Sequence, residues 1–395
     1  MLRSLVERTL EYVDATRLPK SVKAEIKKDH SGLPEFDPEI DAVIDEGIAW
    51  LGRAQDFSAS ADGGVARDFN LVSGWATSYP ETTGYIVPTM IDYGKAQNND
   101  EAIERAKRML DWLVSIQLED GGFQGGRIDA TPVVPVTFNT GQILLGLASG
   151  VAAFGESYRE PMRAAADFLV NSIDEDGCWR SHPTPFAEPG EKVYETHVSW
   201  GLFEAERVDP GRGYGKCGLA NARWAMSWQR DNGWFEKCCL DEPEQPLTHT
   251  IGYNLRGLVE AYRLSSDVSI LDACKLNADG ILSALDADGF LPGRLDANWK
   301  PAVKWVCLTG SAQIAHSMLY LYQFTGDERY MQAGFLLNKY VRRTVLLDGP
   351  DEFRGGVKGS FPVDGEYGRL QYLNWAPKFL IDSLLMEKEV RSNKG

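Results

Sequence analysis

A turn motif that recurs at a nearly constant spacing constrains the fold of this chain more than any other feature. An aspartate or asparagine followed by glycine returns after 58, 56, 56 and 56 residues. The members of this series are Asp62, Asp120, Asp176, Asn232 and Asp288. A fixed period of this length is typical of one supersecondary unit copied along a chain, in which each copy buries its apolar face against its neighbours. The series therefore predicts a repeat protein.

A second landmark follows each turn and opens an apolar helical run. Its copies are Thr83-Gly84, Thr140-Gly141, Thr196-His197, Thr250-Ile251-Gly252, Thr309-Gly310 and, more distantly, Asn374-Trp375. Threonine and asparagine accept hydrogen bonds from unpaired amides at a helix start, and glycine tolerates the positive φ of a turn. Each unit is therefore expected to contain an outer helix, an Asp-Gly turn, an irregular loop and a Thr-capped inner helix. A looser sixth copy turns at Arg354-Gly355-Gly356.

The predicted fold class is all-α, a closed (α/α)6 toroid of six helical hairpins with a period of about 56 residues. The expected outer helices are 37–56, 100–117, 159–173, 216–229, 267–285 and 327–345. The expected inner helices are 82–97, 139–154, 196–207, 249–265, 309–324 and 374–388. An open superhelix is the alternative, but the terminal units have ordinary apolar faces and no polar cap, which favours closure.

The domain organisation that follows is simple. Residues 37–395 form a single toroid domain, because no linker rich in Ser or Pro interrupts the repeats. Residues 1–36 form an N-terminal helix and a charged lead-in. The apolar face of that helix is formed by Leu2, Leu5, Val6, Leu10 and Val13.

Two of the repeats resemble a known family. Residues 106–123 and 220–234 are similar to the glutamine–tryptophan repeats of terpenoid cyclases and protein prenyltransferase β subunits. The twelve-helix ring that this resemblance implies is also the scaffold of six-hairpin glycosidases, many polysaccharide lyases and glucuronyl C5-epimerases, so the fold alone cannot select a function.

The motifs that carry isoprenoid chemistry are incomplete in this chain. The acid motif of the cyclases has its nearest match at Asp286-Ala287-Asp288-Gly289, where the last aspartate is missing. The sequence also lacks an Asp-Asp-x-x-Asp magnesium motif and the aspartate, cysteine and histidine ligands of a prenyltransferase zinc site. The resemblance therefore supports the ring, while the function is expected to be closer to that of carbohydrate-active enzymes with this fold. A terpenoid cyclase or prenyltransferase stays the alternative.

Composition excludes several classes of partner. The formal net charge of −16 opposes binding to a nucleic-acid backbone, because no basic run offsets the repulsion. No stretch reaches the roughly twenty apolar residues of a membrane span, and Arg3, Glu7 and Arg8 interrupt any signal-peptide core. Six cysteines show neither paired metal spacing nor a disulfide framework, and the adjacent Cys238-Cys239 has no ligand-type neighbours. We therefore expect a cytoplasmic protein without a metal or another cofactor.

The long loops between outer and inner helices are expected to gather at one mouth of the ring, where function concentrates. The first loop ends with Trp75, Tyr79 and Glu81. Glu81 stands at a helix start, where the helix dipole should hold the pKa of its carboxyl down, which suits a base or a ligand. An N-terminal capping role is the structural alternative.

Histidines mark the third and fourth loops. Glu195 and His197 end the third loop, and His249 begins the helix after the fourth. Tyr253 follows His249 by four residues, so both face the same side of that helix. Imidazole titrates near neutrality, and a phenol can exchange a proton if a nearby cation lowers its pKa. These four residues and Glu81 are the catalytic candidates, although histidines that merely cap and pack between helices would give the same pattern.

The fifth and sixth loops combine cations with aromatic rings, a mixture that suits an acidic saccharide because aromatic faces stack on sugar rings and cations neutralise carboxylates. The predicted substrate-binding residues are Trp75, Tyr79, Lys304, Trp305, Asp364, Glu366, Arg369, Tyr372 and Trp375.

The sequence thus predicts a carbohydrate-active enzyme that binds an oligo- or polysaccharide, including one with uronate units, in the mouth of the ring. Hydrolysis would need two carboxyl groups, for which Glu81, Glu195, Asp364 and Glu366 are the candidates. Elimination or C5 epimerisation would use His249 and Tyr253 as base and acid, with Lys304 or Arg369 as the neutralising cation. A non-catalytic saccharide-binding scaffold is a further alternative.

Overall fold

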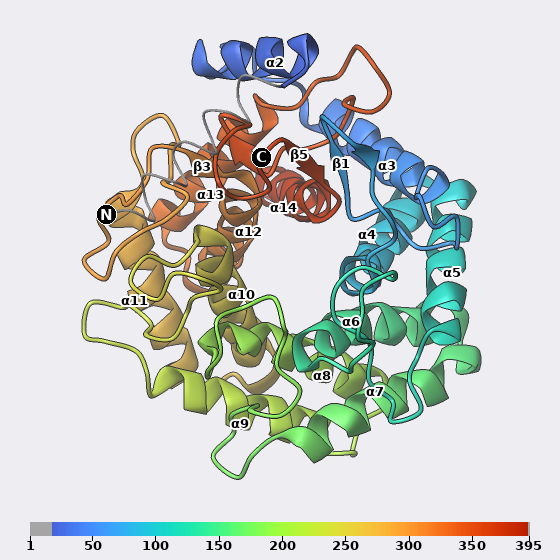
Figure 1. Cartoon of the computed structure of the whole chain (residues 1–395). Coiled ribbons are helices and arrows are strands. Elements are labelled where there is room, and N and C mark those ends of the chain that lie inside the picture. The colour runs from blue at the N-terminus through green and yellow to red at the C-terminus, as the bar shows by residue number, and fades with distance from the viewer. Residues whose placement is uncertain (1–17, 394–395) are drawn as a thin grey trace, which may run out of the picture.

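The computed structural model describes residues 18–393 and has two concentric layers of helices that form a ring (Figure 1). The inner layer contains α4 (Pro80–Gln97), α6 (Thr137–Phe154), α8 (Thr196–Val208), α10 (Thr248–Ser265), α12 (Leu308–Thr325) and α14 (Trp375–Ser392). The outer layer contains α3 (Ile40–Asp56), α5 (Asp100–Ser115), α7 (Arg159–Ser172), α9 (Tyr214–Met226), α11 (Val268–Ala284) and α13 (Glu328–Arg342). The predicted all-α toroid is confirmed, and the predicted helices differ from the observed ones by a few residues at their ends.

The ring is closed. Each inner helix packs against the next one in sequence, and the last, α14, packs against both α4 and α3. Short strands join the first and last units at the mouth, where β1 (Asp68–Asn70) pairs antiparallel with β2 (Gly74–Trp75) on one side and with β5 (Gln371–Leu373) on the other. A second small sheet pairs β3 (Val306–Cys307) with β4 (Ser360–Phe361). The open superhelix is therefore excluded.

The Asp-Gly turn seats each outer helix against the next unit. Gly121 has a φ of 88°, and a Cβ atom on it would lie 2.3 Å from the carbonyl oxygen of Ala164 in the following outer helix, α7. The carboxylate of Asp120 accepts from the backbone N–H of Gly122 at 2.9 Å and so holds the turn closed. Glycine is required here because both the positive φ and the close helix exclude a side chain, which explains why a glycine with positive φ recurs at this turn in every unit.

The landmark threonines act differently from the predicted capping role. Thr140 lies one turn inside α6, and its hydroxyl accepts from the backbone N–H of Phe123, just after the Asp-Gly turn, at 3.0 Å. Thr83 does the same for the N–H of Val65, at 3.0 Å. The threonine therefore ties the loop after the turn to the inner helix instead of satisfying an amide of its own helix. This tie fixes the starting point of the loops that run to the mouth.

A further helix, α2 (Lys20–His30), lies outside the ring (Figure 1). It is tied to the segment just before β4, where Lys358 Nζ lies 2.6 Å from Asp29 Oδ1, and to the loop between β4 and β5, where Val363 packs in a small cluster with Val22. The expected charged lead-in is thus an ordered helix with a buried contact. The apolar face expected over residues 2–13 falls outside the described residues, and the division of the chain at residue 36 stays a prediction.

Candidate active site

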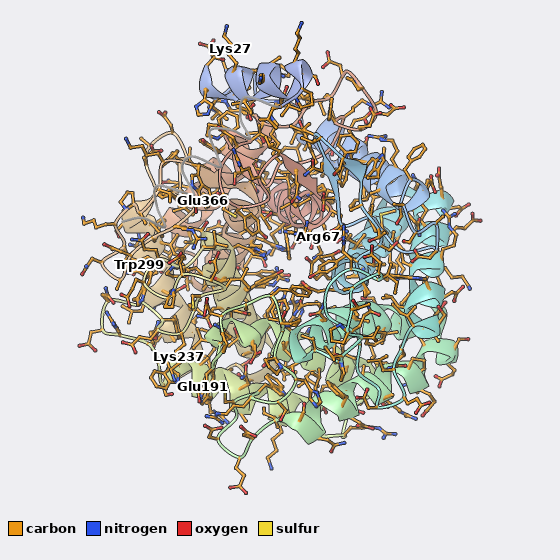
Figure 2. The ribbon with its side chains drawn as sticks, in the orientation of Figure 1. Lys27, Arg67, Glu191, Lys237, Trp299 and Glu366 are labelled. Carbon is orange, nitrogen blue, oxygen red and sulfur yellow. The ribbon has the colours of Figure 1, made fainter. Side chains whose placement is uncertain are left out.

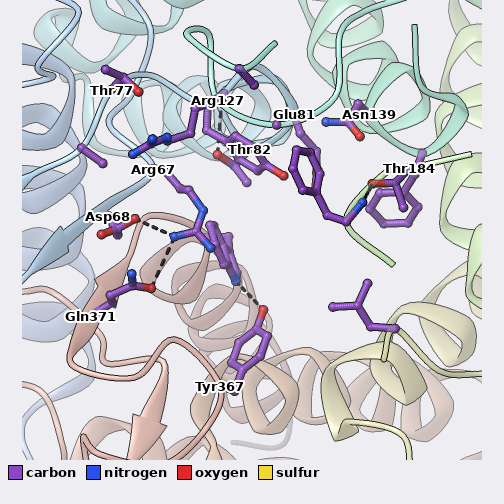
Figure 3. Close-up of a pocket in the computed structure, with 18 of the residues that line it drawn as sticks. Arg67, Asp68, Thr77, Glu81, Thr82, Arg127, Asn139, Thr184, Tyr367 and Gln371 are labelled. Carbon is purple, nitrogen blue, oxygen red and sulfur yellow. Dashed lines mark hydrogen bonds and ion pairs between the residues drawn. The ribbon is translucent and has the colours of Figure 1, made fainter. Parts of the chain in front are cut away.

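A cavity of about 800 Å³ opens where the long loops gather (Figure 3). Residues from units one, two, three, four and six line it. The polar and aromatic side chains of the lining include Arg67, Asp68, Trp75, Tyr79, Glu81, Tyr85, Asn139, Tyr194, His249, Tyr253, Tyr367, Gln371 and Trp375. A concave site of this size with a few convergent polar groups is the ordinary form of a small-molecule site.

Arg67 is a half-buried cation in the lining of the cavity, and the more exposed Arg127 is another. Its Nη1 atom lies 2.7 Å from Asp68 Oδ2 and 3.3 Å from Gln371 Oε1 (Figure 3). The guanidinium carbon lies 5.2 Å from the ring centroid of Trp375 and 6.0 Å from that of Tyr79. The β1–β5 pairing holds this arrangement, since Asp68 and Gln371 both belong to those strands. Both of these hydrogen bonds use Nη1, which leaves other guanidinium N–H groups able to donate to a ligand.

Glu81, in the first turn of α4, is a buried carboxyl group with a raised pKa. Burial raises the pKa of Glu81 to about 7, and the opposing effects of a hydrogen bond with Tyr79 and of the Arg67 charge are smaller. We expected the helix dipole to hold this pKa down, and that expectation is wrong because desolvation of a buried carboxylate outweighs a dipole effect. Glu81 is therefore suited to be a proton donor near neutral pH.

His249, the second residue of α10, faces the same cavity. Its Nδ1 atom lies 2.8 Å from Gln313 Oε1 on α12, and its ring centroid lies 4.3 Å from that of Tyr253 and 5.1 Å from that of Tyr367. Burial lowers the pKa of His249 to about 4, more than the hydrogen bond with Gln313 raises it. The imidazole is therefore neutral at pH 7 and can accept a proton.

Tyr253 lies between two histidine rings at the bottom of the cavity. Its ring centroid is 4.4 Å from that of His197 and 4.3 Å from that of His249. Burial, with the nearby Glu81 carboxyl and Tyr367, raises the pKa of Tyr253 well above its ordinary value. The sequence-based idea that a cation lowers this pKa is therefore wrong, and Tyr253 is a neutral hydroxyl that can donate a hydrogen bond.

Two other catalytic candidates lie behind the wall of the cavity. His197 is buried without lining the cavity, and its Nδ1 atom lies 2.6 Å from Gln142 Oε1. Burial and the charges of Arg256 and Lys378 lower the pKa of His197 well below its ordinary range. Burial raises the pKa of Glu195 to about 8, yet this carboxyl is likewise outside the cavity lining. Neither residue can touch a ligand in this cavity as the structure stands.

Three of the nine predicted substrate-binding residues lie in the cavity lining. Trp75, Tyr79 and Trp375 line the cavity. The six that do not line it are Lys304, Trp305, Asp364, Glu366, Arg369 and Tyr372.

Other contacts engage several of those six residues. Asp364 accepts from His30 of α2 at 2.9 Å, and the exposed Glu366 lies 3.3 Å from Arg294. In Figure 2, Arg67 lies beside the centre of the ring and Glu366 lies away from it. Tyr372 is buried against the ring of Phe353, with centroids 5.5 Å apart.

Sequence reasoning missed Arg67, Asn139 and Tyr367 as site residues. Arg67 shares the first loop with Trp75 and Tyr79, and this proximity to aromatic residues was a usable signal. No spacing pattern in the sequence points to Tyr367. Its hydroxyl accepts from Trp375 Nε1 at 2.9 Å because of the way the sixth loop folds at the mouth (Figure 3).

The described residues hold no group of three or more His, Cys, Asp or Glu side chains placed to bind a metal ion. The six cysteines, which include Cys238 and Cys239, are buried free thiols within residues 18–393. Among the described helices, none has both the length and the apolar character needed to cross a membrane.

Comparison with models of protein families and with curated protein sequences gives no match. Solved structures match closely in shape. An unsaturated glucuronyl hydrolase specific for heparin has a TM-score of 0.71 at 16% identity, over 89% of this chain and 98% of its own. A D-mannose isomerase has a TM-score of 0.71 at 12% identity, over 91% and 100%. A cellobiose 2-epimerase from Bacillus thermoamylovorans has a TM-score of 0.65 at 10% identity, over 87% and 98%.

These neighbours confirm the toroid and the expected likeness to six-hairpin glycosidase-like enzymes that act on carbohydrates. Their sequence identities of 10 to 16% establish a shared fold, and a shared fold does not establish a shared reaction. The resemblance to terpenoid cyclases stays a prediction about the repeats.

Proposed function

We propose that this chain is an enzyme that transfers a proton on a saccharide bound in the mouth cavity, with Glu81 as the acid and His249 as the base. One observation carries the proposal. Burial raises the pKa of Glu81 to about 7 and lowers the pKa of His249 to about 4, within one cavity. Between these values a protonated carboxyl and an unprotonated imidazole coexist, which is the state that general acid–base catalysis needs.

The proposed substrate is a saccharide with a carboxylate, such as a uronate. Trp75, Tyr79 and Trp375 provide aromatic faces of the kind that stack on sugar rings, and Arg67 provides a guanidinium that can donate to a carboxylate. This role falls to Arg67 because the predicted cations, Lys304 and Arg369, lie outside the cavity lining. The carbohydrate enzymes among the structural neighbours support the same class of ligand.

The proposed reaction begins at the sugar carbon next to the carboxylate. Nε2 of His249 takes the proton from that carbon, and Arg67 neutralises the carboxylate so that the developing negative charge is stabilised. In elimination, the electron pair forms a carbon–carbon double bond, the bond to the glycosidic oxygen breaks, and Glu81 gives its proton to that oxygen. In epimerisation, Glu81 instead returns a proton to the same carbon from the opposite face.

Hydrolysis is the second candidate, because Asp68 and Glu81 are both carboxyl groups of the lining and glucuronyl hydrolases are among the structural neighbours. Glu81 would then protonate the glycosidic oxygen, and Asp68 would have to activate a water or attack the sugar. Asp68 is already engaged by Arg67 at 2.7 Å, so its carboxylate is not free to meet a water or the sugar. Proton transfer by His249 therefore remains the better-supported reaction.

The proposal extends to location and partners. A cytosolic enzyme is supported by the six free thiols, and the net charge of −16 favours a saccharide over a nucleic acid.

Two measurements test the proposal. The first is a thermal-shift screen of the protein against neutral, amino and uronic oligosaccharides and isoprenoid diphosphates, because a ligand of the folded state raises the melting temperature. The second incubates each stabilising sugar in D2O and follows deuterium incorporation by NMR, formation of an unsaturated product by ultraviolet absorbance, and release of reducing ends. Reducing ends without deuterium or unsaturation would establish hydrolysis instead, and stabilisation by isoprenoid diphosphates alone would refute a saccharide function.

Matched variants assign the roles. Glu81→Gln and His249→Gln should each reduce kcat by about a thousandfold, since a positioned general acid or base contributes on the order of 10² to 10⁴. Glu366→Gln and His30→Gln make the same chemical changes at exposed sites outside the cavity and should keep wild-type activity. Full activity of His249→Gln would remove His249 from the mechanism.

In the wild type, kcat/KM should fall below a pH of about 4 and above a pH of about 7, the pKa values of the two groups.

A further inference from the structure

Two buried histidines of the ring have the same kind of partner. Nδ1 of His249 on α10 lies 2.8 Å from Oε1 of Gln313 on α12, and Nδ1 of His197 on α8 lies 2.6 Å from Oε1 of Gln142 on α6. Each contact joins two neighbouring inner helices. Both glutamines are buried, with exposed fractions of 3% for Gln313 and 0% for Gln142.

The two pairs differ in what their histidine can reach. His249 lines the cavity, whereas His197 does not. Among the described residues, Nε2 of His197 has no hydrogen-bond partner and is buried, while Nε2 of His249 is not among the buried unpartnered atoms. The ring therefore contains one histidine–glutamine pair at the cavity and a matched histidine–glutamine pair behind the cavity wall.

The amide oxygen determines which nitrogen of His249 carries the proton. A carbonyl oxygen only accepts, so in this contact Nδ1 must be the donor and Nε2 keeps its lone pair. A neutral imidazole with a free Nε2 is the form that can take a proton from a substrate in the cavity. Without a fixed acceptor at Nδ1, both tautomers would be populated and the imidazole could rotate.

Two glycines bring α10 and α12 close enough for this contact. A Cβ atom on Gly252 would lie 3.0 Å from Cβ and 3.1 Å from Oε1 of Gln313. A Cβ atom on Gly310 would lie 2.7 Å from the backbone nitrogen of His249. A side chain at Gly252 would therefore displace the glutamine, and one at Gly310 would push the two helices apart.

We infer that Gln313 is a positioning residue that fixes the Nδ1–H tautomer and the orientation of His249, so that its Nε2 lone pair is directed at the substrate. This inference rests on the proposed function only for the catalytic use of Nε2. The tautomer itself is a property of the protein without substrate.

Gln313 is the partner that raises the pKa of His249, against the larger effect of burial. Tyr253 on α10, Tyr367 from the sixth loop and His197 on α8 are its neighbours. Burial raises the pKa of both tyrosines and lowers that of His197, so all three are uncharged at neutral pH. A charge placed at position 313 should therefore act on His249 without competition.

The direct test is imidazole ¹⁵N NMR of the labelled protein without substrate, with His249 assigned through His249→Gln. We expect the wild-type signal of a protonated Nδ1 and an unprotonated Nε2. Gln313→Leu should give averaged or mixed tautomers at His249 and leave the His197 signals in place. A wild-type Nε2–H tautomer, or no change in Gln313→Leu, would overturn the inference whatever the enzyme does.

The kinetic test uses the sugar found in the screen. Gln313→Leu should lower kcat roughly tenfold with little change in KM, as loss of the partner that orients a histidine typically does. Gln313→Glu should move the acidic limb of the pH profile upward by about one to two pH units, because a carboxylate favours the imidazolium. Gln142→Leu and Gln142→Glu change the matched pair and should leave the acidic limb in place, with thermal melts confirming that each variant folds.

Failure of the inference and failure of the proposed function give different results. If His249→Gln abolishes activity but both Gln313 variants keep the wild-type kcat and pH profile, Gln313 has no positioning role and the acid–base proposal stands. If His249→Gln keeps full activity while the NMR spectra show the expected tautomer, the proposed function fails and the hydrogen-bond assignment survives.

Discussion

Buried titratable groups at the two ends of the inner helices differ in whether they have partners of opposite charge. At the mouth, Glu81 and His249 are buried in forms that burial drives toward neutrality. Further along α10, Glu260 lies eleven residues beyond His249, roughly 16 Å away at the rise of an α-helix. There the charges are paired. Nη2 of Arg256 lies 2.7 Å from Glu260 Oε1, and Nη1 of Arg256 donates to His316 Nδ1 at 2.8 Å.

The charges at the far end are held by several partners at once. Burial alone would raise the pKa of Glu260, but the guanidinium groups of Arg256, Arg263 and Arg207 outweigh it and lower that pKa. The Arg256 guanidinium also lies over the rings of Trp200, at 4.1 Å, and Tyr320, at 4.9 Å. Buried charged groups at the far end are stabilised by several partners of opposite charge. Buried groups at the mouth lack such partners and have shifted pKa values, which is typical of functional sites.

The largest expected effect lies at the far end. Glu260→Gln removes the buried carboxylate that pairs with three arginines and leaves their charges uncompensated. We therefore expect the free energy of unfolding to fall by about 3 to 5 kcal/mol. Urea denaturation followed by circular dichroism measures it. A loss below about 1 kcal/mol would show that the far end is not held by charge pairing and would break the comparison.

At the mouth, the same Glu→Gln change should act with the opposite sign. Because the folded-state pKa of Glu81 is raised from 4.5 to about 7, the wild type loses stability as pH rises through this window, and Glu81→Gln does not. The stability of the variant relative to the wild type should therefore grow between pH 4 and pH 8, by roughly 2 to 3 kcal/mol. Urea unfolding of both proteins at the two pH values tests this, and a constant difference would mean that Glu81 ionises freely in the folded state.

A smaller effect is expected on ligand binding. Arg67→Gln should weaken binding of a uronic oligosaccharide about tenfold while affecting a neutral oligosaccharide much less, because the lost guanidinium paired with a carboxylate. Arg369→Gln, the same change at an exposed position of the sixth loop, should bind both sugars like the wild type. Isothermal titration calorimetry gives both affinities, and equal losses for the two sugars in Arg67→Gln would argue against carboxylate recognition.

The smallest effect is expected on the outer layer. Lys107 and Asp111 form a pair at 2.6 Å on α5, and each side chain is 54% exposed. Lys107→Gln should change the free energy of unfolding by less than about 0.5 kcal/mol. The measurement sharpens the comparison, since a large loss here would mean that ion pairs stabilise this protein regardless of burial.

The ring was predictable from sequence because its determinants are local. The turn glycine recurs in every unit and the landmark threonine in the first five, and each acts within a few residues or on the next unit, as Gly121 and Thr140 do. The placement of His249 was predictable for the same reason, since it stands at a helix start whose position the repeat fixes.

The remaining site residues depend on contacts between distant segments. Arg67 reaches Gln371 across the β1–β5 pairing, and Asp364 is turned toward His30 of α2. No spacing rule relates positions about 300 residues apart. The protonation state of Glu81 was mispredicted because the helix dipole is visible in sequence, whereas the burial of this carboxyl in the folded ring is not.

The pairing of β1 with β5 has a consequence for how the chain acquires its shape during synthesis. Asn374, at the start of α14, donates to the carbonyl oxygen of Ala66 at 2.9 Å, so the first unit is completed only after the sixth unit has been synthesised. Until then α3 and α4 lack the neighbour that α14 provides, and Arg67 lacks Gln371 and Trp375. The cavity therefore forms only after segments about 300 residues apart have both been synthesised, and a partial chain that stops before α14 has most of the helices of the ring without this cavity.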